Sequence, residues 1–329
     1  MVNTRSFARA VEFGIHYEAM CRAVLDTELA IGAGLLGTRT TAQRRRRRER
    51  DDAIALRGHG ETRGARPLVN WHEGGDGPAL LLLNGWTASG LLWPLDWLAQ
   101  LESSYRVIRV DNRGTGWSRC APAPFTMADL ADDAATVLRA CGIERATVLG
   151  LSMGGMIAQE LALRHPDRVE RLILVGTRPP SPAQIDPDPT PMLAALRPPE
   201  GDLRDYIAEM WTSYACPDFA AANPAAMDEL VTQVLDRVTP RQRVFDQMRA
   251  IAAWRGPQRL RRLRVPTTIV HGSGDPLMPV GNGMRLTRLI RDANYVELAG
   301  VGHLVPYEAG ADLVALLEPA QASRRLRTI

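Results

Sequence analysis

Residues 148–155 read Val-Leu-Gly-Leu-Ser-Met-Gly-Gly, and this stretch constrains the fold of the chain more than any other. An apolar run over residues 146–149 predicts a strand, and residues 156–165 predict a helix. Ser152 stands between them with a glycine two residues away on either side, the Gly-x-Ser-x-Gly spacing that lets strand and helix approach closely. Such a turn lifts the serine hydroxyl above a sheet, and the helix start points unpaired backbone N–H groups toward it. We therefore predict a nucleophilic serine; the alternative is a glycine-rich turn with an incidental serine.

From Arg66 onward, strand patterns alternate with helix patterns. Residues 79–83 form a wholly apolar run, which is typical of a strand buried on both faces. A helix is predicted over residues 127–141, with Thr126 as its N-cap. This alternation predicts an α/β fold with a mostly parallel, doubly wound sheet. Further strands are expected at residues 67–72, 105–110, 171–175, 267–270 and 295–298, and further helices at residues 91–101, 286–290 and 305–317.

The alternation is interrupted between Thr177 and about Leu263. Six prolines crowd residues 179–191, and helical patterns follow near residues 203–215, 225–237 and 241–254. We expect residues 178–263 to form a helical insertion that caps the carboxyl edge of the sheet, where ligands bind in open α/β folds. The α/β core would then comprise residues 65–177 and 264–329.

Residues 1–64 differ in composition from the rest and predict a helical N-terminal extension with an arginine-rich linker. Phe7, Val11 and Ile15 recur at four-residue spacing, and residues 44–48 are five consecutive arginines. Two roles stay open, a helix packed on the body and a weak peripheral contact with anionic lipid. No secretory signal is expected, because the apolar stretch is interrupted by charge. Nucleic-acid binding is disfavoured, since no aromatic residues interleave with the arginines.

Charge and cysteine content indicate which partners and which cellular compartment to expect. The formal net charge is +3 over 329 residues, which gives no reason to expect a polyanionic partner. The four cysteines are widely spaced and contain no Cys-x-x-Cys pair. We interpret them as reduced thiols of a cytoplasmic protein, rather than as a zinc site or a disulfide framework.

Three residues that could act together each follow a predicted strand, so a parallel sheet would bring Ser152, Asp275 and His303 to one edge. A serine hydroxyl becomes a good nucleophile when a base within hydrogen-bond reach takes its proton. His303 suits that role near neutral pH, and Asp275 would fix its tautomer and stabilise the imidazolium. Asp-Pro and Gly-His turns are often only structural. Their occurrence in the order serine, acid, histidine predicts a catalytic triad.

From about Arg66 to Leu317 the chain resembles the α/β-hydrolase superfamily. Within it, the chain is most similar to the esterase, enol-lactonase and cofactor-free haloperoxidase-like branch, which carries a helical cap. The stretches that match are residues 111–116 (Asp-Asn-Arg-Gly-Thr-Gly), 150–155 (Gly-Leu-Ser-Met-Gly-Gly), 274–275 (Gly-Asp) and 302–303 (Gly-His).

The resemblance implies an oxyanion hole made by two backbone N–H groups, those of Met153 and Trp86. Relatives usually have His-Gly where this chain has Asn84 and Gly85, so the support of that loop differs here. The implied chemistry is two-step acyl transfer, which needs neither a metal nor an organic cofactor.

An apolar, aromatic cap favours a small hydrophobic ester or lactone as substrate. Trp86, Met153, Trp211 and Tyr214 are the expected substrate-binding residues. The same triad would also serve a C–C bond hydrolase, a thioesterase or an acyltransferase, and a slow-turnover ligand receptor is a further alternative. Association into a homo-oligomer stays open as well.

Overall fold

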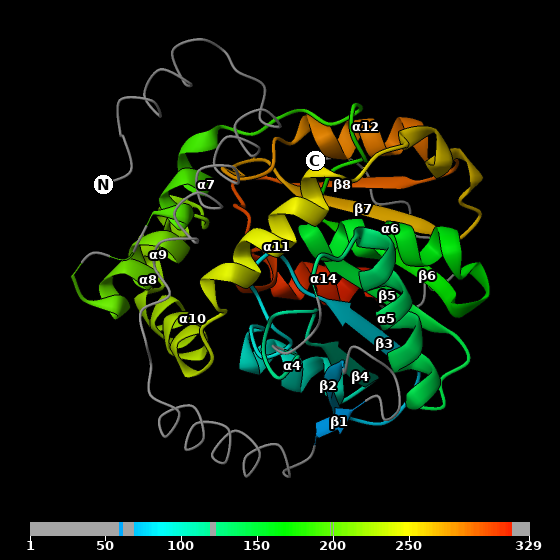
Figure 1. Cartoon of the computed structure of the whole chain (residues 1–329), viewed down its shortest axis with the longest axis horizontal. Helices are drawn as coiled ribbons and strands as arrows, with labels where there is room; N and C mark the ends of the chain where they lie inside the picture. Colours follow the sequence, from blue (N-terminus) through cyan, green and yellow to red (C-terminus); the bar gives the residue numbers. More distant parts are fainter. Residues whose placement is uncertain (1–58, 62–68, 119–122, 198, 200, 318–329) are drawn as a thin grey trace.

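Eight strands form one central sheet in the order β1-β2-β4-β3-β5-β6-β7-β8 (Figure 1). The computed structural model describes residues 59–61, 69–118, 123–197, 199 and 201–317. The predicted N-terminal helices and the arginine run lie outside the described residues. The strands are β1 (His59–Glu61), β2 (Asn70–Gly74), β3 (Ala79–Leu83), β4 (Arg106–Val110), β5 (Ala146–Leu151), β6 (Val169–Val175), β7 (Thr267–Gly272) and β8 (Asn294–Leu298).

The six strands from β4 to β8 in this order pair in parallel, which confirms the predicted mostly parallel sheet. Strands β1 and β2 add an antiparallel edge. Strand β1 lies within the residues assigned to the extension, because three residues at a sheet edge carry no readable period. Strand β2 begins three residues later than predicted. Its extent is set by the residues that pair with β4, and not by the apolar pattern in the sequence.

Strand register brings the loops of interest to one edge. Leu83 pairs with Gly150, Leu151 pairs with Val175, and Val175 pairs with Val270. The carboxyl ends of β3, β5, β6 and β7 therefore lie side by side, as parallel pairing requires. The segments that follow these four strands begin at Asn84, Ser152, Gly176 and Ser273.

Helices cover both faces of the sheet. Side chains alternate along β3, so that Leu81 and Leu83 pack with one set of helices, and Leu80 and Leu82 pack with another. The first set is α5 (Met127–Ala140), α6 (Met153–Arg164) and α12 (Gly281–Leu289); the second is α4 (Leu95–Glu102), α13 (Val305–Glu308) and α14 (Gly310–Leu317). Short 3₁₀ helices occupy Pro166–Arg168 and Pro257–Arg262.

Local signals explain most helix boundaries. The predicted cap of α5 is confirmed, since the Thr126 side chain accepts from the Asp129 N–H, and the Asp129 carboxylate accepts from the Thr126 N–H. Helix α4 begins only after Pro94, four residues later than predicted. The predicted helix over residues 305–317 is two helices, because Ala309 leaves the helical conformation at φ −144°.

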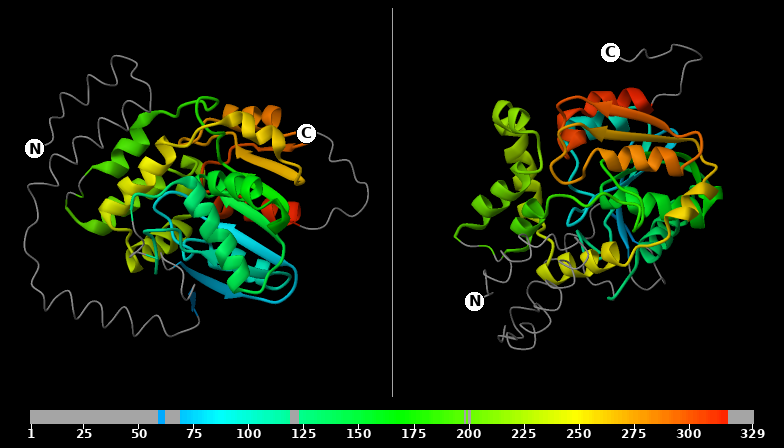
Figure 2. Two further views of the ribbon diagram at one scale, coloured as in Figure 1. Left: turned by 45° about the vertical axis from the view of Figure 1, so that its right-hand side comes forward. Right: turned by 90° about the horizontal axis from the view of Figure 1, so that it is seen from above.

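Between β6 and β7 the chain forms five α-helices among its described residues. Two of them were not predicted, and each begins at a proline that suits the first helical position. Figures 1 and 2 show α7–α10 gathered at one end of the molecule, with α11 running back toward the sheet. The five are α7 (Pro189–Leu196), α8 (Leu203–Thr212), α9 (Pro217–Ala222), α10 (Pro224–Asp236) and α11 (Arg241–Ala252). We call residues 178–263 the insertion. No helix in the described part of the chain is long and apolar enough to span a bilayer.

Candidate active site

Ser152 occupies the predicted sharp turn between β5 and α6. Its φ is 56°, a left-handed conformation that is uncommon for a residue with a side chain. The Ser152 N–H donates to the Val175 carbonyl at 2.9 Å, so the neighbouring strand holds the turn. A Cβ atom on Gly154 would lie 1.9 Å from the Leu83 carbonyl oxygen, and one on Gly150 would lie 2.4 Å from the Gly154 oxygen. Close packing therefore requires both glycines of the motif.

His303 and Asp275 meet at the same edge. His303 Nδ1 lies 2.7 Å from Asp275 Oδ2. The other carboxylate oxygen accepts from the Leu277 and Met278 N–H groups at 2.8 Å and 2.7 Å. Since a carboxylate accepts, His303 donates from Nδ1 to Asp275. A Cβ on Gly176, which follows β6, would lie 3.4 Å from His303 Nδ1, so the pair borders the strand next to β5.

A second histidine lies beside this pair. His271 is fully buried at the end of β7, with Nε2 3.7 Å from Asp275 Oδ2 and 2.8 Å from the Met278 carbonyl oxygen. Burial lowers the pKa of His271, so it stays neutral and donates from Nε2 to that carbonyl. His271 thereby supports the turn that carries Asp275, and no pattern around residue 271 predicts this role.

Asn84 stands where relatives usually have histidine, and its side chain supports the loop that follows β3. Its Oδ1 accepts from the Gly85 N–H at 2.8 Å. Its Nδ2 donates to the carbonyls of Ser89 and Leu92 at 3.1 Å and 2.7 Å. All of these bonds are buried, and together they close the loop after β3 on itself.

The two predicted oxyanion donors lie on the segments after β3 and β5. Within the described residues, the backbone N–H groups of Trp86 and Met153 donate to no protein acceptor. The indole N–H of Trp86 donates to the Val244 carbonyl of α11 at 3.0 Å. Both backbone donors are thus available to a ligand.

Comparison with known proteins identifies the family of the chain. A model of the alpha/beta hydrolase fold matches residues 78–309. The chain belongs to the alpha/beta hydrolase fold family. It is therefore a hydrolase, and the resemblance inferred from its motifs is confirmed.

Relatives within the family have different activities. The chain is 30% identical to the 2-hydroxymuconate semialdehyde hydrolase of Pseudomonas sp. strain CF600, over 76% of this chain and 88% of that protein. A thermophilic esterase from Thermogutta terrifontis is 26% identical, with a TM-score of 0.65 over 79% of this chain and 96% of that one. The enol-lactonase of Burkholderia xenovorans LB400 shares the fold, with 24% identity and a TM-score of 0.66 over 80% and 96% of the two chains.

A cavity of about 60 Å³ opens beside the serine of this hydrolase. Ser152, Trp86 and Met153 are among the residues that line it. Its other walls are mostly apolar side chains that the sequence had not singled out, among them Met156, Met192 and Ile251. Among the residues that the structure describes, no three His, Cys, Asp or Glu side chains gather as metal ligands would.

The structure places Trp211 and Tyr214 elsewhere. Their rings contact each other with centroids 5.6 Å apart and pack with Leu230 in the core of the insertion. Neither residue lines the cavity. The aromatic spacing reflects packing, because Trp211 is on the buried face of α8, which packs against α10, and Tyr214, two residues after the helix ends, joins the same cluster. Tyr214 touches the site through its main chain, since its carbonyl accepts from the His303 N–H at 2.9 Å.

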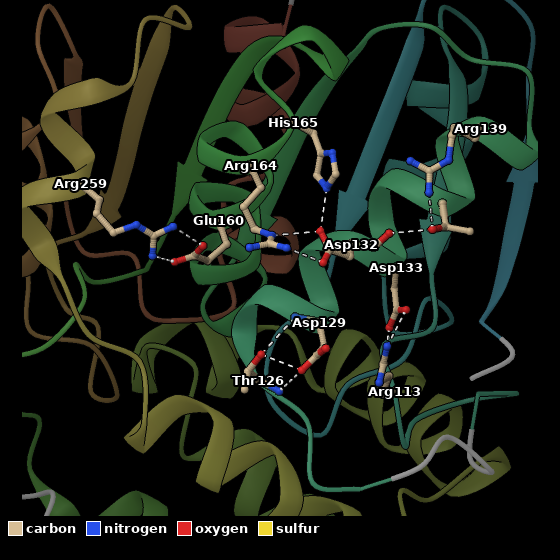
Figure 3. Close-up of polar contacts among 11 residues, drawn as sticks. Arg113, Thr126, Asp129, Asp132, Asp133, Arg139, Glu160, Arg164, His165 and Arg259 are labelled. Atoms are coloured by element: carbon tan, nitrogen blue, oxygen red, sulfur yellow. Dashed lines mark hydrogen bonds and ion pairs between the residues drawn. The ribbon is translucent and has the colours of Figure 1, made fainter. Parts of the chain in front are cut away.

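Ion pairs connect α5 and α6 to each other and to neighbouring segments (Figure 3). Arg259 donates to both Glu160 oxygens at 2.6 Å and 2.8 Å, and the Trp254 indole adds a third bond at 2.9 Å. The Glu160 side chain is only 2% exposed, so these partners compensate a buried charge. The contact joins the helix that follows Ser152 to the segment where the insertion returns to the core.

Proposed function

We propose that this hydrolase cleaves a carboxylic ester or lactone of a small hydrophobic substrate through an acyl-enzyme on Ser152. The observation that carries the proposal is the 2.7 Å contact between His303 Nδ1 and Asp275 Oδ2, at the sheet edge where the strained serine turn lies. An acid that holds one imidazole nitrogen prepares the other to take a serine proton. The small, mostly apolar cavity supports a substrate with a compact acyl group.

The reaction has two steps. His303 Nε2 removes the hydroxyl proton as Ser152 attacks the carbonyl carbon, and the oxyanion is stabilised by the N–H groups of Trp86 and Met153. His303 then protonates the leaving alcohol oxygen, which departs as the acyl-enzyme forms. In the second step, His303 removes a proton from water, and the water oxygen attacks the acyl carbon. Collapse of that intermediate breaks the bond to Ser152, whose oxygen takes the proton back from His303, and releases the acid.

A second candidate is hydrolysis of a C–C bond next to a ketone. Support for it comes from the relative named 2-hydroxymuconate semialdehyde hydrolase, to which the chain is 30% identical. In the ester reaction the leaving group is an alkoxide, whereas here it is a carbon anion that needs protonation on carbon. The same triad could activate water or serine in that reaction, so the substrate decides between the two.

A substrate panel tests the proposed function. We would assay short-chain 4-nitrophenyl esters, lactones, thioesters and a dienoic ring-cleavage ketone with the wild type and Ser152→Ala. The expected result is rapid turnover of esters or lactones by the wild type, with loss of turnover in the variant. Turnover of the ketone alone would favour C–C hydrolysis. Turnover of no compound, with tight binding of one, would favour a ligand receptor.

The cap role of the insertion belongs to the same proposal. Four contacts support it. Trp86, Thr87 and His303 each form a hydrogen bond directly with an insertion residue. Gly302 donates to a carboxylate that also accepts from an insertion residue. We place the boundaries at residues 178 and 263, where the chain leaves and rejoins the strand–helix alternation.

A further inference from the structure

Thr87 is the second residue with a side chain that adopts a left-handed conformation at this edge of the sheet. Its φ is 65°. Threonine is β-branched, and this conformation brings its side chain into conflict with its own backbone. Such strain persists only where the surroundings over-determine the conformation. Thr87 directly follows Trp86, the proposed oxyanion donor, so what holds Thr87 also influences that donor.

The insertion supplies the groups that hold Thr87. Its N–H donates to Gln247 Oε1 at 2.9 Å, although the two residues are 160 positions apart in the sequence. Its carbonyl accepts from Thr239 Oγ1 at 2.7 Å. Both backbone polar groups of the strained residue are therefore satisfied by side chains at or next to α11.

The Gln247 amide is itself fixed in one orientation. It is fully buried, and its Nε2 donates to the Arg113 carbonyl at 3.2 Å. Exchanging the oxygen and nitrogen ends of the amide would place donor against donor and acceptor against acceptor. Helix α11 is also seated tightly here, because a Cβ on Gly114 would lie 2.8 Å from Arg243 Cβ.

These bonds bracket the oxyanion donor. On one side of Trp86, the Gly85 N–H is held by Asn84 Oδ1; on the other, the Thr87 N–H is held by Gln247 Oε1. The Trp86 N–H lies between two anchored amides and is itself available to a ligand. Its direction follows from the two peptide planes on either side of it.

We infer that Gln247 is a positioning residue for the oxyanion hole, so that the insertion sets transition-state geometry in addition to covering the site. The inference rests on the proposed function, because it needs an oxyanion to form near Trp86. Stabilisation of this kind depends on donors that are aligned before the reaction. Loss of the Gln247 bond frees the strained Thr87 peptide to turn, and the Trp86 N–H turns with it.

The test compares Gln247→Met, which keeps the length of the side chain and loses the acceptor, with Gln247→Glu, which keeps an acceptor for the Thr87 N–H. Gln242→Met is the matched control, since Gln242 is exposed on the same helix and, among the described residues, its side chain bonds to Asp246 one turn away. We would measure kcat and KM on an activated ester and the affinity of an alkyl boronic acid, whose tetrahedral adduct on serine mimics the oxyanion.

Gln247→Met is expected to lower kcat by ~10- to 100-fold, less than the ~10²–10³ lost on removing an oxyanion donor outright. Its KM should stay within about twofold, and boronate affinity should fall by a factor similar to that for kcat, because only transition-state contacts are lost. Gln247→Glu should recover part of the loss, and Gln242→Met should match the wild type.

A folded Gln247→Met enzyme with wild-type kcat and boronate affinity would overturn the inference, as would a change in KM alone. If Gln247→Met does not fold, Thr239→Val takes its place, because this substitution removes the other bond to Thr87. A Thr239→Val enzyme with the kcat and boronate affinity of the wild type would likewise overturn the inference. A wild type that neither hydrolyses esters nor binds boronate would instead contradict the proposed function.

Discussion

Ser152 and Thr87 share a left-handed backbone at the same edge of the sheet, yet different parts of the molecule hold them. The Ser152 turn is held by the sheet, through the Val175 carbonyl and two glycines packed at van der Waals limits. The Thr87 turn is held by two side chains that approach from the insertion, Gln247 and Thr239. The proposed nucleophile therefore depends on the core, and the proposed oxyanion donor beside it depends on the core and the insertion together.

The two halves of the site can therefore vary in different ways. A turn made by backbone bonds and glycines changes little unless the sheet itself changes. A turn held by distant side chains can be retuned by substitutions on one helix of the insertion. Relatives with one fold and different named activities are consistent with such a division.

The largest expected effect concerns the core half of the site. Asp275→Asn should lower kcat by about 10⁴-fold, because the amide favours the wrong His303 tautomer. Asp186→Asn is the control, since Asp186 lies near the entry to the insertion and contacts Gln184. Steady-state kinetics on the best ester would decide. An active Asp275→Asn enzyme beside an inactive Asp186→Asn enzyme would mean that the acid has been misassigned.

The serine turn can also be broken by sterics alone. In Gly154→Ala the new methyl group would lie 1.9 Å from the Leu83 carbonyl oxygen, so α6 and β3 must separate. A displacement of about 1 Å can cost ~10²-fold in rate, and we expect at least that loss in kcat. Gly142→Ala controls for lost stability without a steric clash, because a Cβ there meets nothing within 4 Å while its φ of 67° strains an alanine. Equal rates for Gly154→Ala and wild type would show that the turn tolerates expansion.

Asn84 tests the core side of the oxyanion loop. Asn84→Ala removes three buried hydrogen bonds that close the loop. We expect a destabilisation of about 1–3 kcal/mol, because buried partners are left unsatisfied, and a smaller loss of kcat than in Gly154→Ala. Urea unfolding and ester kinetics would measure the two effects. An unchanged unfolding midpoint would indicate that the loop is closed by other contacts.

The smallest effect concerns the pH dependence of stability. Burial lowers the pKa of His271 in the folded protein, so below about pH 6.5 the unfolded chain binds a proton that the folded chain does not. Folding stability should therefore fall as the pH falls from about 6.5, by at most about 1.4 kcal/mol per pH unit from this group. The His271→Gln variant has no imidazole at this position to titrate. Its folding stability should therefore fall less than that of the wild type over the same pH range. Parallel curves from pH 7 to pH 5.5 would show that His271 titrates normally.

Local patterns made the core half of the site predictable. The Gly-x-Ser-x-Gly spacing, the apolar strands and the Thr126 cap each depend on residues close in sequence, and each was found as predicted. The mostly parallel sheet followed from the alternation of strands and helices. His303 and Asp275 were found because a parallel sheet collects strand ends at one edge.

The helical insertion was expected, but its contribution to the site could not be predicted. The physical reasons differ from residue to residue. The prolines near residue 189 favoured a loop, but Pro189 begins α7, where its missing N–H costs nothing. Trp211 and Tyr214 were assigned to substrate because aromatic residues suit both pockets and helix packing, and packing prevailed. The bond from Thr87 to Gln247 spans 160 positions, and nothing local marks either partner.

Covalent labelling at Ser152 tests the central claim most directly. The wild type and Ser152→Ala would be treated with a fluorophosphonate, and adducts would be counted by intact mass and mapped to a peptide. We predict one adduct per wild-type chain, on Ser152, and none on the variant, because the proposed triad activates that hydroxyl alone. An adduct on another residue, equal labelling of the variant, or a properly folded wild type that resists labelling would contradict the assignment of Ser152 as the nucleophile.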